Sequence, residues 1–358
     1  MSEEVAARLR EAIAAHGPIS FAEFMEIALY SPGGFYDRPP VGERGHFVTS
    51  PHVHDVFGRL LAGALRSLWD GIGRPAPFPI VELGAGDGTL ARRLLSDLVP
   101  IPLDYTAIER SAGARQRLGE LPVRVATSLE LLDRRVVGCI LANELLDNLP
   151  FEWVRRTEES LVQVFVGVSG DRFVAIERPW PDELDELAPD LQVGQEAVVS
   201  IEAHRTVERV AGSLARGYAL FIDYGEGRTA QVHGYRDHRV IADVLAEPGS
   251  ADITAGVDLE SLARHAERYG MRSLGPFSQR SALIALGITD WFERQRIEQA
   301  KLLDERAGLE AIRTYGGRSR ASLLVDPSGL GRLRWLLLAT AECEWPAWAR
   351  DAAEAPED

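Results

Sequence analysis

A glycine-rich run lies directly after a short apolar segment and directly before an amphipathic one. It reads Glu82-Leu-Gly-Ala-Gly-Asp-Gly88, so that Gly84, Gly86 and Gly88 alternate with other residues. Glycine adopts positive φ angles without strain and lets a ligand approach the backbone, and a following helix presents free N–H groups. The run therefore predicts a binding loop, although a plain strand-to-helix turn would use the same residues.

Two carboxylates near this loop favour a nucleoside ligand. Glu82 precedes the glycines, and Glu109 ends the next predicted strand. A carboxylate at that strand end can accept hydrogen bonds from both ribose hydroxyls. A dinucleotide fingerprint needs its third glycine one position later, where this chain has Thr89, so the spacing disfavours NAD. The pattern instead predicts S-adenosylmethionine, with Glu82 near its amino-acid end and Glu109 at its ribose.

Polar residues also follow the fourth predicted strand, in the segment Ala142-Asn-Glu-Leu-Leu-Asp-Asn-Leu-Pro150. The carboxyl ends of parallel strands meet at one sheet edge, so this segment would face the methyl donor. Asn143, Glu144 and Asp147 could orient an amine or guanidinium nucleophile, bind its charge and assist loss of its proton, and Asn143 would also contact the cofactor. The other interpretation is that Asn143 and Asp147 cap the following turn. Enzymes that methylate DNA bases typically carry two prolines where this chain has Leu145-Leu146, so the segment does not match that class of methyltransferase.

Apolar and amphipathic segments alternate along the middle of the chain. This alternation predicts a doubly wound α/β domain, in which right-handed helical crossovers join parallel strands. The predicted strands are 79–83, 103–108, 123–125, 136–142 and 217–223, and the predicted helices are 90–98, 112–118, 202–214 and 259–269. Further strands at 151–156, 161–168 and 172–177 are joined by tight polar turns, which indicates an antiparallel insertion.

We expect four regions along the chain. Residues 1–75 would form a helical and loop region that covers the cofactor site, and 76–287 the cofactor-binding domain, with the inserted segment around 151–200. Residues 288–345 would form a helical region packed on the core, with helices over roughly 288–315 and 328–341. Residues 346–358 would be a disordered tail, because small and charged side chains dominate there.

The composition is that of a globular protein and restricts the partners. Of 358 residues, 46% are hydrophobic and 26% charged, and the net charge is −15. This charge would suit a cationic substrate, although a role in solubility is the commoner explanation, and it disfavours nucleic acids and anionic membranes. The apolar runs are too short to span a membrane. Two distant cysteines and the His52-Val-His54 motif provide no metal site. We expect a cytoplasmic protein, because no targeting segment is evident, and the sequence leaves a homodimer open.

Several sequence blocks, taken together and in order, point to a family. They are Tyr30-Ser-Pro-Gly-Gly-Phe-Tyr36, Gly45-His-Phe-Val-Thr-Ser-Pro51, Val81-Glu-Leu-Gly-Ala-Gly-Asp-Gly-Thr-Leu90, Ala142–Pro150 and Phe221-Ile-Asp-Tyr-Gly225. In this order they resemble the MidA-type methyltransferases, a family that includes the mitochondrial protein that assists assembly of respiratory complex I.

The resemblance implies a seven-stranded methyltransferase domain with an added substrate-side region. It also implies S-adenosylmethionine as the cofactor and a protein substrate that is methylated on an arginine. In this family the loop Phe47–Pro51 is expected to close over the cofactor, which adds Thr49, Ser50 and Pro51 to the predicted cofactor site.

Three positions depart from the family pattern. His46 and His52 stand where acids are common, and Asp87 stands where arginine is frequent. Two functions therefore remain open: a methyltransferase acting on a protein arginine, and a cofactor-binding assembly factor whose transferase activity is weak or lost. A nucleotide-dependent oxidoreductase is disfavoured by Thr89.

Overall fold

A seven-stranded sheet organises the structure, a computed structural model that describes residues 3–37, 49–225, 231–236, 239–241 and 243–356. Its strands are β2 (Phe78–Leu83), β3 (Leu103–Ile108), β4 (Arg124–Ala126), β5 (Val136–Asn143), β10 (Leu214–Asp223), β14 (Arg272–Ser278) and β15 (Arg334–Ala339). They follow the order β14-β15-β10-β5-β2-β3-β4. All neighbours from β10 to β4 are parallel, whereas β15 runs antiparallel to β10 and to β14. The strand order reverses between β2 and β5, which creates a crevice at the carboxyl edge.

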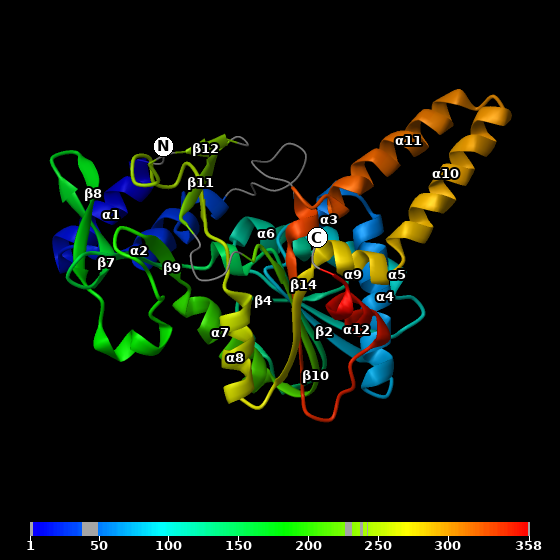
Figure 1. The fold of residues 1–358 in the computed structure, drawn as a ribbon, viewed down its shortest axis with the longest axis horizontal. Coiled ribbons are helices and arrows are strands. Elements are labelled where there is room, and N and C mark those ends of the chain that lie inside the picture. The colour runs from blue at the N-terminus through cyan, green and yellow to red at the C-terminus, as the bar shows by residue number, and fades with distance from the viewer. Residues whose placement is uncertain (1–2, 38–48, 226–230, 237–238, 242, 357–358) are drawn as a thin grey trace.

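Helices cover both faces of this sheet (Figure 1). They are α4 (Val56–Gly71), α5 (Thr89–Asp97), α6 (Ala112–Leu118), α7 (Ile201–Ser213), α8 (Leu259–Arg268) and α9 (Gln279–Ala285). Ile80 and Leu141 pack with α4, α5 and α9, whereas Val81 and Ile140 pack with α7 and α8. Successive strand side chains point to opposite faces, so strands covered on both sides are apolar throughout.

A second, antiparallel sheet lies beside the first and carries the N-terminal helices. It consists of β1 (Ile19–Ser20), β6 (Glu152–Arg156), β7 (Leu161–Ser169), β8 (Arg172–Pro179) and β9 (Glu196–Val199), which form the order β1-β7-β6-β9 with β8 also paired to β7. The helices packed on it are α1 (Glu3–His16), α2 (Phe21–Met25) and the π-helix η1 (Glu26–Tyr30). Phe21 and Phe24 of α2 join Phe151 and Val166 in one core, which fixes η1 above the carboxyl edge of the main sheet.

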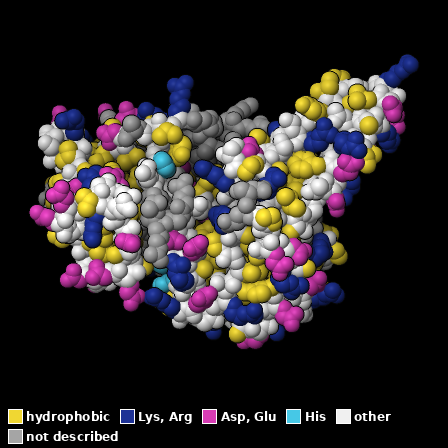
Figure 2. Space-filling view, in the orientation of Figure 1, with side chains coloured by type: hydrophobic (Ala, Val, Ile, Leu, Met, Phe, Trp, Pro, Cys, Tyr) yellow, Lys and Arg dark blue, Asp and Glu magenta, His cyan; other side chains and the backbone are white. Residues whose placement is uncertain are grey.

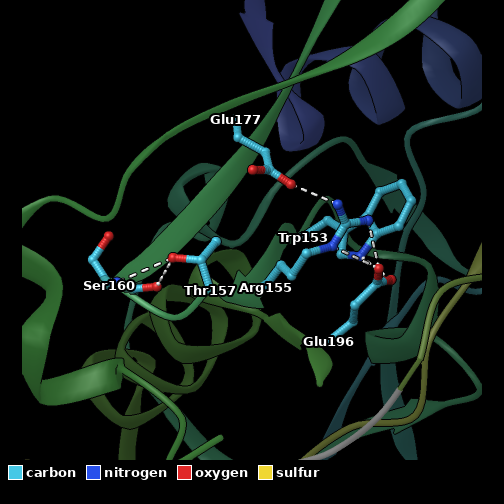
Figure 3. A network of polar contacts seen from close by, with 6 residues as sticks. All are labelled: Trp153, Arg155, Thr157, Ser160, Glu177 and Glu196. Carbon is cyan, nitrogen blue, oxygen red and sulfur yellow. Dashed lines mark hydrogen bonds and ion pairs between the residues drawn. The ribbon is translucent and has the colours of Figure 1, made fainter. Parts of the chain in front are cut away.

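Polar contacts hold the strands of this second sheet in register (Figure 3). Arg155 on β6 donates hydrogen bonds to Glu196 on β9 and to Glu177 on β8, and the indole of Trp153 donates to Glu196 at 2.9 Å. A turn closed by Thr157 and Ser160 links β6 to β7. β6 begins at Glu152, which borders the cavity described below, so this network also fixes the position of Glu152.

The remaining elements are short or peripheral. The other strands are β11 (His233–Arg236), β12 (Arg239–Ile241) and β13 (Asp252–Thr254). The other helices are η2 (Phe35–Asp37), α3 (Ser50–Val53), η3 (Leu129–Leu131), η4 (Leu146–Asn148), η5 (Asp182–Leu187), α10 (Ile288–Asp304), α11 (Gly308–Ser322), η7 (Leu323–Val325), η8 (Leu330–Arg332) and α12 (Ala347–Glu354). α10 and α11 form a hairpin that projects from the body (Figure 1). None of the helices in the described ranges is both long and apolar enough to cross a membrane.

The predicted α/β fold class is confirmed, but two regional predictions differ from the structure. The helix predicted over 328–341 is wrong, because β15 occupies Arg334–Ala339 and pairs between β10 and β14. A short apolar run cannot be assigned to helix or strand by periodicity alone. The main sheet thus extends beyond residue 287, and the region 288–345 is not purely helical.

The disordered tail predicted over 346–358 is replaced by α12. Trp348 is buried, its ring lies 5.9 Å from that of Trp335 and 6.2 Å from that of Phe277, and its indole N–H donates to Ser67 Oγ at 2.9 Å. One buried tryptophan can dock a segment whose average composition resembles a disordered chain.

We expect the substitution Trp348→Ala to reduce the free energy of unfolding by about 3–5 kcal/mol, because it empties a packed aromatic site. Chemical denaturation would measure the loss. Asp351→Ala on the exposed side of α12 is the matched control and should change stability by less than about 0.5 kcal/mol. Equal stability of the two variants would contradict the docking of α12.

Candidate functional site

A cavity of about 750 Å³ lies at the carboxyl ends of the parallel strands. Residues at or just after the ends of β2, β3, β4 and β5 all line it, including Gly84, Glu109, Thr127 and Asn143. The opposite wall comes from the second sheet and the N-terminal helices. Four successive strand ends therefore converge on one volume, as expected where ligands bind to open α/β sheets.

The glycine loop turns beneath this cavity. Gly84 has a φ of +67°, and a Cβ atom there would lie 2.8 Å from Leu145 Cδ1, so a larger residue would be both strained and obstructed. Gly86 also lines the cavity. Gly88 instead begins α5 with a φ of +78°, where a Cβ atom would lie 2.9 Å from the side chain of Leu121. Gly88 thus shapes the turn from behind.

Glu109 lies at the end of β3 with its carboxylate already oriented. One oxygen accepts the N–H of Gly86 at 2.8 Å and the other accepts the N–H of Ser111 at 2.7 Å. Each carboxylate oxygen retains further acceptor capacity. Since Glu109 borders the cavity, it can accept hydrogen bonds from two vicinal hydroxyls.

Glu82 is buried at the end of β2 beneath the loop. The hydroxyl of Tyr105 donates to its Oε2 at 2.7 Å. Burial raises the pKa of Glu82 to about 8, although the Tyr105 hydrogen bond partly opposes this rise. A cationic ammonium group nearby would restore the charged carboxylate.

Asn143 and Glu144 form a strained turn at the end of β5. Glu144 has a φ of +52°, which is unfavourable for a residue with a side chain, and its N–H donates to Ile222 O at 2.7 Å. Its Oε1 accepts hydrogen bonds from the backbone N–H of Ser50 at 2.8 Å and from Asn143 Nδ2 at 3.2 Å. Burial raises the pKa of Glu144 to about 7. Asn143 Oδ1 is buried without a hydrogen-bond partner among the described residues, so it can still accept one from a ligand.

Asp147 is not brought to the cavity with these two residues. It lies in η4, is buried and is absent from the described cavity lining. Burial and the nearby carboxylate of Asp223 raise its pKa well above the usual range. Asp223 in turn accepts the N–H groups of Leu145 and Leu146 at 3.0 and 2.6 Å. The pair therefore supports the Asn143–Glu144 turn from behind.

The N-terminal segment closes one side of the cavity. Thr49 and Pro51 line it, whereas Ser50 is fully buried and reaches Glu144 through its backbone N–H. The Ser50 hydroxyl contacts the buried amide of Gln279, 3.4 Å from Gln279 Oε1. The rest of the predicted loop, including His46 and Phe47, lies outside the described residues.

Two of the departures from the family pattern contact each other. His52 Nε2 lies 3.1 Å from Asp87 Oδ2, and its Nδ1 lies 2.8 Å from the hydroxyl of Thr49. Burial raises the pKa of Asp87, but hydrogen bonds from His52 and Thr89 outweigh this and lower it to about 2. His52 and Asp87 thus connect the N-terminal loop to the glycine turn.

Sequence reasoning missed the aromatic and acidic wall opposite the strand ends. The rings of Tyr30 and Tyr36 stack at 5.4 Å, and the Arg110 guanidinium lies 4.3 Å from the Tyr30 ring centroid and pairs with Glu26. Glu152 borders the cavity from β6. In the sequence, Tyr36 was marked only by the block Tyr30-Ser-Pro-Gly-Gly-Phe-Tyr36, and no neighbouring residues mark Glu152.

Among the described residues, no group of three or more His, Cys, Asp or Glu side chains is arranged to hold a metal ion. The site instead combines a glycine turn, the oriented carboxylate of Glu109 at the end of β3, and an amide oxygen of Asn143 without a hydrogen-bond partner among the described residues. On a sheet of this strand order, these features define an S-adenosylmethionine-dependent methyltransferase. Residues 60–277 match the family model described as "Putative S-adenosyl-L-methionine-dependent methyltransferase", and the chain belongs to this family.

Named relatives and solved structures agree with this assignment. The chain is 31% identical to "Protein arginine methyltransferase NDUFAF7, mitochondrial" of Homo sapiens, over 76% of this chain and 70% of that protein. It is 30% identical to the Drosophila melanogaster homolog, over 93% and 84%. A superfamily member from Burkholderia thailandensis, solved with S-adenosyl-homocysteine, is 27% identical with a TM-score of 0.82, and the alignment covers 97% of this chain and 94% of that one.

These comparisons confirm S-adenosylmethionine as the cofactor. They also correct one prediction. The human, fish and insect relatives are named as mitochondrial proteins, which contradicts the cytoplasmic location expected from the sequence.

We expect cofactor binding to release protons near pH 6.5. In the free protein Glu82 is then mostly protonated, because its pKa is about 8, and the cofactor's ammonium group would favour the carboxylate. Affinity should therefore rise between pH 6 and 7.5. Calorimetry in two buffers of different ionisation enthalpy measures the protons released.

The matched control for this linkage is Glu82→Gln, which keeps the side-chain shape but removes the titrating group. Proton release should disappear in this variant. Release that persists would assign the linkage to another group and contradict the position given to Glu82.

Proposed function

We propose that this methyltransferase transfers methyl groups from S-adenosylmethionine to a side-chain nitrogen of an arginine in a protein substrate. Asn143 and Glu144 are the residues proposed to hold the acceptor nitrogen, with Glu82, Gly84, Gly86 and Glu109 at the cofactor. The relatives named as protein arginine methyltransferases support this choice of acceptor.

The charge balance of the cavity wall carries the proposal. Several wall carboxylates are matched by arginines of the same wall: Glu26 by Arg110, and Glu130 and Glu202 by Arg209. By contrast, no Lys, Arg or His among the described residues forms an ion pair with Glu144 or Glu152. Carboxylates that are removed from water without a counter-charge are costly, and a cationic acceptor would compensate them.

A guanidinium fits this wall better than a smaller cation. It is planar, stays charged at all relevant pH values and can donate two parallel hydrogen bonds to a carboxylate. When bound, the cofactor supplies an electrophilic methyl group on sulfur. Glu144 would bind the guanidinium, orient one nitrogen towards that methyl group and accept the proton that this nitrogen loses. Asn143 Oδ1, which lacks a partner, would accept a second N–H.

The contact between His52 and Asp87 bears on the alternative of an assembly factor with little activity. That alternative rested on the substituted residues His46 and His52. Because His52 Nε2 lies 3.1 Å from Asp87 Oδ2, this histidine connects the loop to the glycine turn. It therefore gives no reason to expect a lost activity, and His46 lies outside the described residues.

We expect kcat/KM for methyl transfer to rise about tenfold per pH unit below pH 7 and to level off above it. The active form of Glu144 is the carboxylate, its pKa is raised to about 7, and the guanidinium does not titrate in this range. Glu144→Gln should lower kcat by roughly 10²–10⁴ and remove the pH dependence.

Glu23→Gln is the control for this variant, because Glu23 also borders the cavity but is exposed. It should retain the pH profile of the unmodified protein. If Glu144→Gln kept full activity with the same profile, Glu144 would not be the group that binds and deprotonates the acceptor.

Transfer of labelled methyl groups from S-adenosylmethionine to proteins of a cell extract tests the function itself. Acid hydrolysis should recover the label as methylated arginine, and Glu144→Gln should abolish it. Label recovered only on another residue type, or no transfer despite cofactor binding, would overturn the proposed acceptor.

A further inference from the structure

The hairpin of α10 and α11, residues 288–322 and called the arm from here on, projects from the body, and no other helix or strand of the described residues covers its far end (Figure 1). The two helices pack on each other. Their buried residues are only Ile288 and Trp291 in α10 and Ala311 and Ala321 in α11. Most side chains of the arm are therefore not buried.

Large apolar side chains lie on that outer surface. Ile297, Leu303, Leu309, Ile312 and Tyr315 are between 55% and 71% exposed. In α11 these residues recur every third position, which places them in a continuous stripe along the helix. Figure 2 shows hydrophobic side chains of the arm interspersed with basic ones. Exposed apolar groups gathered on one element are typical of an interaction surface.

The charges of the arm are divided along its length. The tip half, residues 298–310, holds four acidic and two basic residues. The base half, residues 288–297 and 311–322, holds two acidic and five basic residues. The whole chain has a net charge of −15, so most surfaces of two copies repel each other, whereas the arm holds seven basic and six acidic residues.

We propose that the arm pairs with the arm of a second copy of this chain in an antiparallel two-fold arrangement. In an antiparallel pair related by a two-fold axis, the tip of each arm lies beside the base of the other arm. The acidic residues of the tip then face the basic residues of the base. The apolar stripes then meet at the centre and form a four-helix bundle of two hairpins. This dimer does not depend on the identity of the methyl acceptor.

Sedimentation velocity over micromolar concentrations tests the pairing. The full chain should sediment as a dimer of 39.3 kDa protomers. The double variant Leu309→Glu/Ile312→Glu should sediment as the monomer, with unchanged helix content and cofactor binding. The matched control is Val99→Glu, which introduces the same charge at an exposed apolar residue away from the arm and should remain dimeric.

A charge-swap experiment distinguishes arm pairing from any other contact. A tip variant, Asp304→Lys/Glu310→Lys, and a base variant, Arg313→Glu/Arg318→Glu, should each be monomeric, because like charges then face each other. Mixing the two variants should restore dimers. A monomeric unmodified chain, dimers that survive the arm substitutions, or variants that fail to combine would each overturn the proposal.

Discussion

Glu144 is half-buried at the end of β5 and is held by its neighbour Asn143 and by two parts of the chain that are distant in sequence. Its own backbone, at a positive φ, is fixed by Ile222 O on the neighbouring strand β10. Its Oε1 accepts Asn143 Nδ2 and the N–H of Ser50, which lies in the N-terminal segment. The strained turn persists because these contacts determine it from several sides. Without them, a half-buried carboxylate in this conformation would be unfavourable.

This arrangement explains why elements far from the cavity are needed for it. The Asp223 carboxylate holds the two backbone N–H groups after Glu144, and Asp147 stays beside it as a buried acid. Gln279 is fully buried between the Ser50 hydroxyl, the carbonyls of Leu324 and Leu330, and the Trp335 indole. The C-terminal part of the chain thus supports the loop that orients Glu144.

The second sheet supplies what the main sheet lacks. A doubly wound sheet offers glycine turns and acids at its strand ends, which suit a nucleoside. The wall opposite the strand ends, where the proposed acceptor would bind, is formed by η1 and the start of β6, and tyrosines and carboxylates face the same volume there. The His52–Asp87 contact joins this N-terminal layer to the glycine loop. In the proposed function, cofactor and acceptor binding are therefore divided between the two sheets and meet at Glu144.

The sequence by itself determined the features that depend on neighbours in the chain. The glycines at 84, 86 and 88, the acid that ends β3 and the polar residues after β5 all follow apolar strands, so local periodicity sufficed for the α/β fold class and for S-adenosylmethionine as cofactor. Long-range strand pairing decided that residues 334–339 form β15 instead of the predicted helix, and long-range packing of Trp348 decided that α12 docks on the body. Tertiary structure alone turned Asp147 inward, brought Ser50 to Glu144 and placed Glu152 at the cavity, because their partners lie on elements that are remote in sequence.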